Sequence, residues 1–167
     1  MICIGIDPGQ KGGLAIIHGN GNVSVTSMIL AGKDLDVAAI KDWIWSNIVV
    51  ETDLGTIDWN KDIIAYLEKV HSMPEQGVSS VFKFGQNYGT LIGIIGTMGI
   101  PLHLVTPQAW KKNILAGTTK DKAAAKDFCR RVYPNVSLLA TKRSRVIHDG
   151  MADALCIARY ASLMSGE

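Results

Sequence analysis

Four carboxylates of this chain have the spacing of ligands for a divalent metal ion. Asp7 ends the apolar run of MICIGIDPGQ, and Glu68 ends a second apolar run in DIIAYLEKV. Asp149 and Asp153 are four residues apart in HDGMADALCIA, so a helix would place them on one face, one turn apart. Carboxylate oxygens are the hard ligands that suit Mg²⁺ or Mn²⁺. These residues predict metal-dependent chemistry, provided that the fold brings them together.

Each of these acids also has a purely structural explanation. Asp-Pro-Gly is turn chemistry, because proline fixes φ and glycine accepts a positive φ. Asp149 can cap a helix, and Asp153 can be an exposed acid that complements the helix dipole. Like charges one helical turn apart repel each other, however, and a bound cation would offset that repulsion. The combination of four acids at the ends of elements that one topology can join favours the metal site.

The order of the expected elements is that of a mixed sheet flanked by helices. The GNGN at 19–22 supplies a tight turn, so the first three strands form an antiparallel meander. Later strands alternate with helices, and the resulting crossovers make strands four and five parallel to the first. Strands one and four are then neighbours, and Asp7 and Glu68 share the carboxyl edge. The expected strands are 1–7, 12–19, 22–30, 62–70 and 101–105, and the expected helices are 34–50, 79–98, 107–115, 119–133 and 148–164. Asp34 and either Ser79 or Ser80 are the expected N-caps of the first two helices.

Length and composition indicate one globular domain over residues 1–167. The chain is 47% apolar and 19% charged, and it has no linker, low-complexity tract or internal repeat. Its three cysteines lack CxxC spacing, and its start resembles a strand and not a signal peptide. The apolar run TLIGIIGTMGIPLHLV is interrupted by glycines and a proline, and it is too short to span a bilayer. We therefore expect a cytoplasmic protein without a structural zinc site or a membrane role.

The net charge of +2 hides a strong asymmetry along the chain. Residues 34–62 hold seven acids and two lysines, whereas residues 109–147 hold ten bases and two aspartates. Phosphate backbones are bound largely through lysine and arginine, so the basic segment predicts a nucleic-acid surface unless it is only a solvated face. The candidate DNA-binding bases in it are Lys111, Lys112, Lys120, Lys122, Lys126, Arg130, Lys142, Arg143 and Arg145.

Five stretches occur in the order found in one known family. They are GIDPGQKGGLAII, YLEKVHSM, FKFGQNYG, WKKNILAGTTKDKAAAK and HDGMADALCIA. In type and order they resemble the RuvC-type Holliday junction resolvases, most closely their phage branch, and the resemblance covers nearly the whole chain. It implies a ribonuclease H-like fold, a homodimer, and symmetric nicking of four-way DNA junctions with two Mg²⁺ or Mn²⁺ ions per active site. A phage-encoded enzyme would act in the cytoplasm of a bacterial host.

The resemblance also assigns roles to residues. It implies that Asp7, Glu68, Asp149 and Asp153 are the metal ligands. It places Lys122, and less directly Lys111, beside the scissile phosphate. It puts the FKFGQNYG helix at the dimer interface, with the start of that helix near Ser79 approaching DNA.

Some positions depart from the family pattern. Bacterial members carry an aromatic wedge three residues after the second carboxylate, where this chain has His71 in a longer loop. Glu75 in that loop is a rival to Glu68, although no strand would fix its position. The last two acids are four residues apart here and three apart in the bacterial enzymes. These differences predict relaxed sequence preference and cutting of other branched DNA, such as forks and flaps.

Three other interpretations stay open. His148 adjoins Asp149 and could move a proton or orient a ligand in catalysis, or it could cap the helix. GIDPGQKGGLAII also resembles the first phosphate loop of actin-like and sugar-kinase ATPases, although those proteins need two lobes and this chain holds one. The chain could also be a non-catalytic protein that binds branched DNA.

Overall fold

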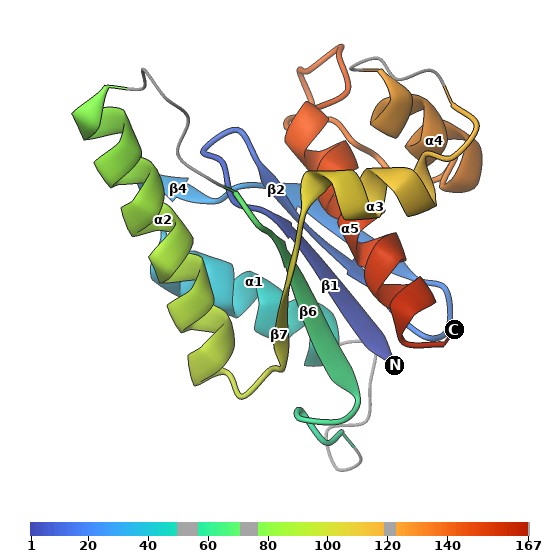
Figure 1. Ribbon diagram of the computed structural model, residues 1–167, viewed down its shortest axis with the longest axis horizontal. Helices are drawn as coiled ribbons and strands as arrows, with labels where there is room; N and C mark the ends of the chain where they lie inside the picture. Colours follow the sequence, from blue (N-terminus) through green and yellow to red (C-terminus); the bar gives the residue numbers. More distant parts are fainter. Residues whose placement is uncertain (50–56, 71–76, 119–122, 167) are drawn as a thin grey trace.

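The computed structural model describes residues 1–49, 57–70, 77–118 and 123–166. Its centre is a five-stranded sheet of order β3-β2-β1-β6-β7 (Figure 1). β1 pairs antiparallel with β2, which pairs antiparallel with β3, while β1, β6 and β7 run parallel. This topology confirms the predicted antiparallel meander followed by two parallel strands. The strands are β1 (Ile2–Asp7), β2 (Gly13–Ile17), β3 (Val23–Ser27), β6 (Ile63–Glu68) and β7 (Leu102–Val105).

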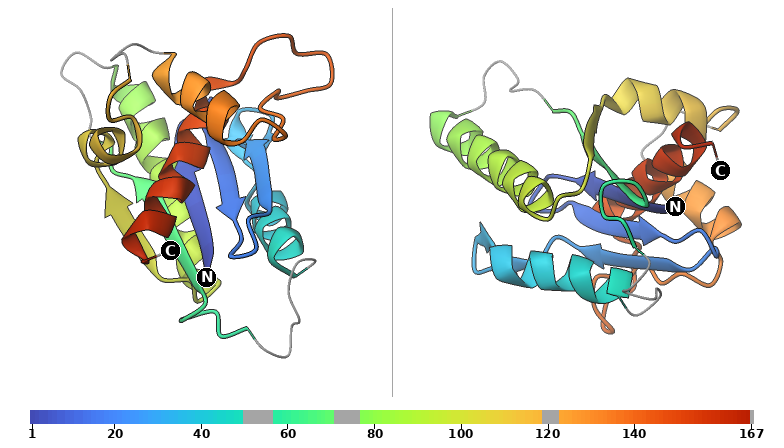
Figure 2. Two further views of the ribbon diagram at one scale, coloured as in Figure 1. Left: turned by 90° about the vertical axis from the view of Figure 1, so that its right-hand side faces the viewer. Right: turned by 90° about the horizontal axis from the view of Figure 1, so that it is seen from below.

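Helices cover both faces of the sheet (Figure 2). One hydrophobic core lies under α1 and α2, and a second lies under α3, α4 and α5. The three parallel strands end at the same edge, at the top of Figure 1, where α2, α3 and α5 begin. The helices are α1 (Val37–Val49), α2 (Val78–Thr97), α3 (Pro107–Ile114), α4 (Ala124–Val132) and α5 (Asp149–Met164).

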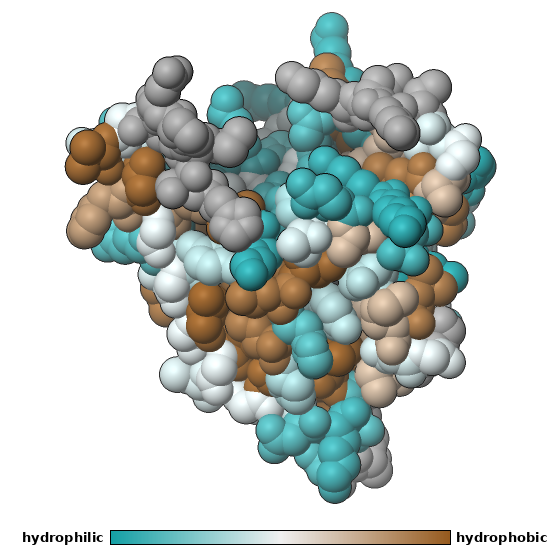
Figure 3. Space-filling model, viewed as in Figure 1, coloured by the Kyte–Doolittle hydropathy of each residue, from teal (hydrophilic) through white to brown (hydrophobic). Residues whose placement is uncertain are grey.

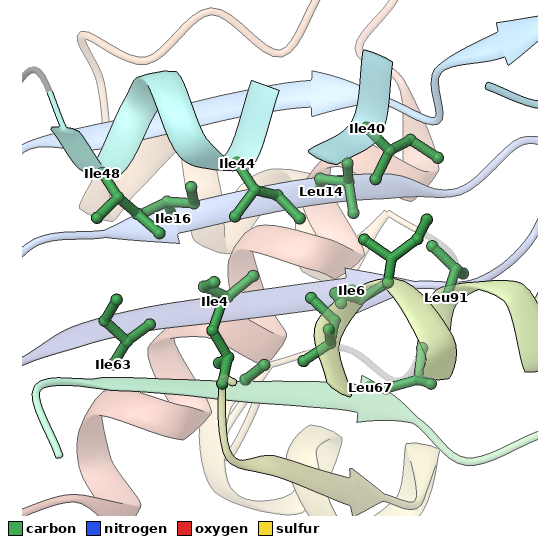
Figure 4. Close-up of a cluster of buried hydrophobic side chains, with 14 of the residues drawn as sticks. Ile4, Ile6, Leu14, Ile16, Ile40, Ile44, Ile48, Ile63, Leu67 and Leu91 are labelled. Carbon is green, nitrogen blue, oxygen red and sulfur yellow. The ribbon is translucent and has the colours of Figure 1, made fainter. Parts of the chain in front are cut away.

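The alternation of side chains along β1 separates the two cores. Ile4 and Ile6 point into the core under α1 and α2, where Ile40 and Ile44 of α1 meet them (Figure 4). Successive strand residues point to opposite faces, so the odd-numbered positions of β1 face α5. Asp7 shares that odd parity and therefore belongs to the α5 face of the sheet.

Glycine lets α5 lie directly on β1. A Cβ atom at Gly5 would stand 2.2 Å from the carbonyl oxygen of Ala154 and 2.2 Å from the backbone nitrogen of Ala158. No real side chain fits at that separation, because both neighbours are helix backbone atoms. The close approach fixes the depth at which α5 sits over the strand that carries Asp7.

The structure corrects two local expectations, the N-caps of α1 and α2. Asp34 is not the cap of α1, because it lies in β5 (Asp34–Leu35), which pairs with β4 (Leu30–Ala31) in a separate hairpin. The capping carboxylate is Asp36, which accepts the backbone N–H of Ala39 at 3.0 Å. Neither predicted serine begins α2, since its N-cap is Gly77 and makes no side-chain capping bond. The helix prediction began too early, at Asp34, because the short β4-β5 hairpin comes first and two-residue strands carry almost no periodic signal.

The tryptophans of the acidic segment, residues 34–62, differ in their burial. Trp43 and Trp59 are half-buried against the core under α1. Trp45 is exposed and stacks on Trp59 with ring centroids 5.0 Å apart. Within the described ranges, none of the helices is long and apolar enough to cross a membrane.

Candidate active site

Asp7 and Glu68 lie side by side at the carboxyl edge of the sheet. Each is the last residue of its strand, and the parallel register pairs Ile6 with Leu67, one position before them. Both follow a residue of the α1 and α2 core, so both side chains belong to the opposite face, under α5. The structure thus brings together the two carboxylates that the strand pattern predicted.

Trp110 orients Glu68, and the sequence reading missed this residue. Its indole N–H donates to the Oε1 atom of Glu68 at 2.9 Å, and the ring is fully buried. The tryptophan belongs to α3, whose start is fixed by Thr106, because the Thr106 side chain accepts the backbone N–H of Ala109. The available signal in the sequence is a tryptophan beside Lys111, in the helix that directly follows the last strand.

The beginning of α5 presents the other two acids. His148 is the N-cap, and its Nδ1 atom accepts the backbone N–H of Met151 at 3.3 Å. The capping interpretation of His148 is therefore confirmed, while a catalytic role for it stays a prediction. Asp149 follows as the first helical residue, so it is not the cap. Asp153 lies one turn further along the same helix.

Asp149 differs from the other three acids in its surroundings. Its side chain is 74% exposed, and its Oδ1 atom lies 2.5 Å from the Nζ atom of Lys126 on α4. That ion pair directs Asp149 toward α4, at the rim of the site. Asp7, Glu68 and Asp153 form the inner group.

Two of the inner carboxylates, Asp7 and Asp153, have raised pKa values. Burial, followed by the nearby charges of Glu68 and Asp153, raises the pKa of Asp7 from 3.8 to about 7. Burial also raises the pKa of Asp153 from 3.8 to about 6; Glu68 and Asp149 act in the same direction, and Lys111 and Lys126 act against them. The lysines therefore compensate only part of the negative charge. An additional cation would lower the free energy of the ionised site.

The inner acids have the right ligand atoms for a divalent cation, but their side chains are not yet arranged around one point. Oxygen donors of like charge on three rigid elements are the donor set that Mg²⁺ or Mn²⁺ takes. In the described ranges, however, no three acidic, histidine or cysteine side chains converge into a ready metal cage. Binding would therefore require side-chain movement, for which Asp149 at the rim has the room.

The described DNA-binding candidates lie on α2, α3, α4 and the loop before α5. Lys111 and Lys112 lie on α3, and Lys111 places its Nζ atom 5.1 Å from the centroid of the Trp110 ring. Ser79 lies in the first turn of α2. Lys126 and Arg130 lie on α4, and Lys142, Arg143 and Arg145 lie in the loop before α5. His71, Glu75, Lys120 and Lys122 fall outside the described residues.

Comparison with known proteins identifies the fold. No protein-family model and no curated protein sequence matches the chain. Among solved structures, the chain matches Thermus thermophilus RuvC in complex with a Holliday junction substrate at 16% identity, with a TM-score of 0.61. That match covers 99% of this chain and 94% of the other. A second Thermus thermophilus RuvC structure matches at 19% identity and a TM-score of 0.56, over 99% of this chain and 97% of the other. The chain thus has the fold of RuvC, which confirms the predicted α/β fold class.

Proposed function

We propose that this chain is a Holliday junction resolvase, a metal-dependent endonuclease that nicks two strands of a four-way DNA junction symmetrically. One observation carries the proposal: in a chain with the RuvC fold, Asp7 and Glu68 end adjacent parallel strands on the face that the helix of Asp153 covers. Burial, and then the charges of Glu68 and Asp153, raise the pKa of Asp7 to about 7. Three mutually repelling carboxylates destabilise a fold unless a ligand uses them.

Asp7, Glu68, Asp153 and Asp149 are the residues that would hold the metal. Two divalent ions at this edge would supply an activated water and stabilise the leaving 3′ oxygen of the phosphodiester. Trp110 keeps Glu68 in one orientation, which preserves the position of its free oxygen. Lys126 keeps Asp149 beside α4 while the site is metal-free.

The bases near this edge would bind the DNA backbone. The charge of Lys111 acts on both Asp7 and Asp153, so its ammonium group lies close to the place where a scissile phosphate would sit. Lys122, outside the described residues, has the same proposed role on grounds of sequence alone. Binding through phosphates is independent of sequence, which agrees with the proposed relaxed choice of cutting site and of branched substrate.

The test is incubation of the chain with labelled four-way junction, plain duplex and ATP, each with and without Mg²⁺. Paired nicks near the crossover, only with Mg²⁺ and only on branched DNA, are the expected result. A gel shift without cutting would identify a non-catalytic binding protein, and loss of ATP would support the ATPase alternative. Mapping the nicks on junctions of different core sequence tests the relaxed specificity, which incision at a single tetranucleotide would contradict.

A further inference from the structure

A closed loop carries three exposed bases directly before the candidate metal ligands. We define the basic loop as residues 139–147. The loop begins after Leu138, which is buried, and ends before His148. The backbone N–H of His148 donates to the carbonyl oxygen of Leu138 at 2.8 Å. The next residue after His148 is Asp149. The two ends of the loop are therefore fastened at the start of α5, and the loop projects beyond the helices (Figure 2, left).

The tip of the basic loop is braced from within. The backbone N–H of Ser144 donates to the carbonyl oxygen of Thr141 at 3.0 Å. The Ser144 hydroxyl accepts the N–H of Thr141 at 3.2 Å, and the two hydroxyl oxygens lie 2.9 Å apart. Lys142 and Arg143 occupy the two central positions of this turn. Because the turn is already formed, a ligand would not have to order it on binding.

The charges of the basic loop are available to a ligand. Lys142, Arg143 and Arg145 are exposed, and none of them pairs with a carboxylate in the part of the chain that the structure describes. On the neighbouring helix α4, by contrast, Lys126 pairs with Asp149 and Arg130 pairs with Asp127 at 3.1 Å. The loop thus adds three unpaired bases to Lys111 and Lys112 on α3.

We propose that the basic loop is a preformed clamp for the phosphate backbone of one duplex arm of the junction, beside the strand that is cut. This inference rests on the proposed function and adds a second point of contact to the one at Lys111. Residues 139–147 contain no aromatic side chain, so the loop offers no stacking platform for unpaired bases. Cations on a rigid turn suit regularly spaced phosphates and read no sequence.

The experiment compares two charge-matched variants with the parent chain. One variant carries Lys142→Ala, Arg143→Ala and Arg145→Ala, and the other carries Lys33→Ala, Lys41→Ala and Lys61→Ala, three exposed lysines of the acidic segment and the hairpin beside it. Binding to a four-way junction and to plain duplex is measured over a series of salt concentrations, and phosphate ethylation interference locates the contacts. If each loop base contacts one phosphate, the plot of log K for binding against log salt concentration becomes less steep by about 2.7 in the loop variant. Ethylation interference also disappears from one arm of the junction. The matched variant keeps the parent slope and pattern.

Two further outcomes make the test decisive. A parent slope and an unchanged interference pattern in the loop variant would overturn the proposal, as would an equal loss in both variants. Arg143→Lys with Arg145→Lys keeps the charges and is expected to keep the slope, which separates charge from damage to the loop fold. Failure of the proposed function is distinguishable, because the parent chain would then not nick the junction, whereas the salt slopes report the phosphate contacts of the loop alone.

Discussion

At the scale of single residues, the candidate site depends on charges that the fold gathers and compensates only in part. Asp7 and Glu68 are neighbours because two parallel strands end in register. Strand parity could be predicted from sequence, since alternating apolar residues fix which positions share a face. The indole bond from Trp110 to Glu68 could not, because the two residues are 42 positions apart and only the packing of α3 joins them.

Substitution of Asp7 by Asn tests both the chemistry and the electrostatics. Asn keeps the shape and the turn chemistry but removes a charged ligand, so Mg²⁺-dependent incision is expected to fall by a factor of about 10² or more. Junction binding persists, because one carboxylate fewer faces the phosphates. A folded variant that nicks at the parent rate would contradict the metal site at its first residue.

The same variant has a predicted pH dependence without metal. The pKa of Asp7 is raised from 3.8 to about 7, so the folded state binds more protons than the unfolded state between these values. The stability of the metal-free protein therefore falls as pH rises from about 4 to about 7, by at most about 4 kcal/mol from this group. Asp7→Asn removes that loss and melts at a higher temperature than the parent at pH 7.5 in chelator. Equal melting temperatures there would show that burial and the neighbouring charges do not raise the pKa of Asp7.

Trp110→Phe tests the orientation of Glu68. Phenylalanine fills most of the buried space but leaves the Oε1 atom without its donor, so Mn²⁺ affinity and incision are both expected to fall by about 10–100-fold. Trp43→Phe is the matched control, because it makes the same change on the other face of the sheet. Both variants lose stability, but only Trp110→Phe weakens Mn²⁺ binding measured by titration calorimetry. Unchanged Mn²⁺ affinity in Trp110→Phe would reduce Trp110 to a core residue.

At the scale of elements, close backbone contacts position α5 over the strand and turn that contain Asp7. A Cβ atom at Gly150 would stand 2.2 Å from the carbonyl oxygen of Lys11 and 2.4 Å from the Cα atom of Gly12. The start of the helix that carries Asp149 and Asp153 therefore rests on the turn after Asp7. Sequence patterns predicted the order of the five sheet strands and the five helices, because their apolar residues recur with a strand or helix period. They did not predict these contacts, since a glycine in a helix has no periodic signature.

Gly150→Ala is expected to move the acids of α5 away from Asp7. The added methyl group meets backbone atoms that cannot rotate away, so α5 must shift, at a cost of about 1–3 kcal/mol in stability. A shift of that kind moves the helical acids relative to Asp7 and lowers incision by up to about 10²-fold. Gly93→Ala on α2, a face proposed below for the dimer, is the control for monomer stability alone: nothing lies within 4 Å of its Cβ position, and alanine favours a helix. Chemical denaturation and incision assays measure both effects, and a neutral Gly150→Ala would contradict the close packing.

At the scale of the whole molecule, the charge asymmetry of the sequence becomes an asymmetry of faces. Asp36 and Asp42 belong to the start and body of α1, which covers one face of the sheet, while the bases of α3 and α4 cover the other. Composition along the chain could predict two charged regions but not their separation by the sheet. That separation follows from the three-dimensional fold, which places α1 and α2 on one face of the sheet and α3, α4 and α5 on the other.

An exposed apolar surface lies over α2 and β7. Val78 is 86% exposed, Phe82 is 74% exposed and Leu104 is 49% exposed. Figure 3 shows brown surface over β7 and at the start of α2. Along α2, Gly85, Gly89 and Gly93 follow one another at helical spacing with open space at each Cβ position. An exposed apolar surface is typical of a protein interface. The neighbouring row of glycines would let a second helix approach α2 closely.

We therefore expect a homodimer of twice 18.0 kDa that joins through α2 and β7. Symmetric incision requires two sites related by a two-fold axis, which an isologous interface supplies. Gly89→Glu adds bulk and charge to this face without touching the monomer, so it should sediment as a folded monomer and lose paired nicking. Ala38→Glu makes a comparable change at an exposed position of α1 and should stay dimeric and active. Sedimentation velocity at micromolar concentration separates the outcomes, and a parent chain that is monomeric yet cuts both strands would exclude the dimer.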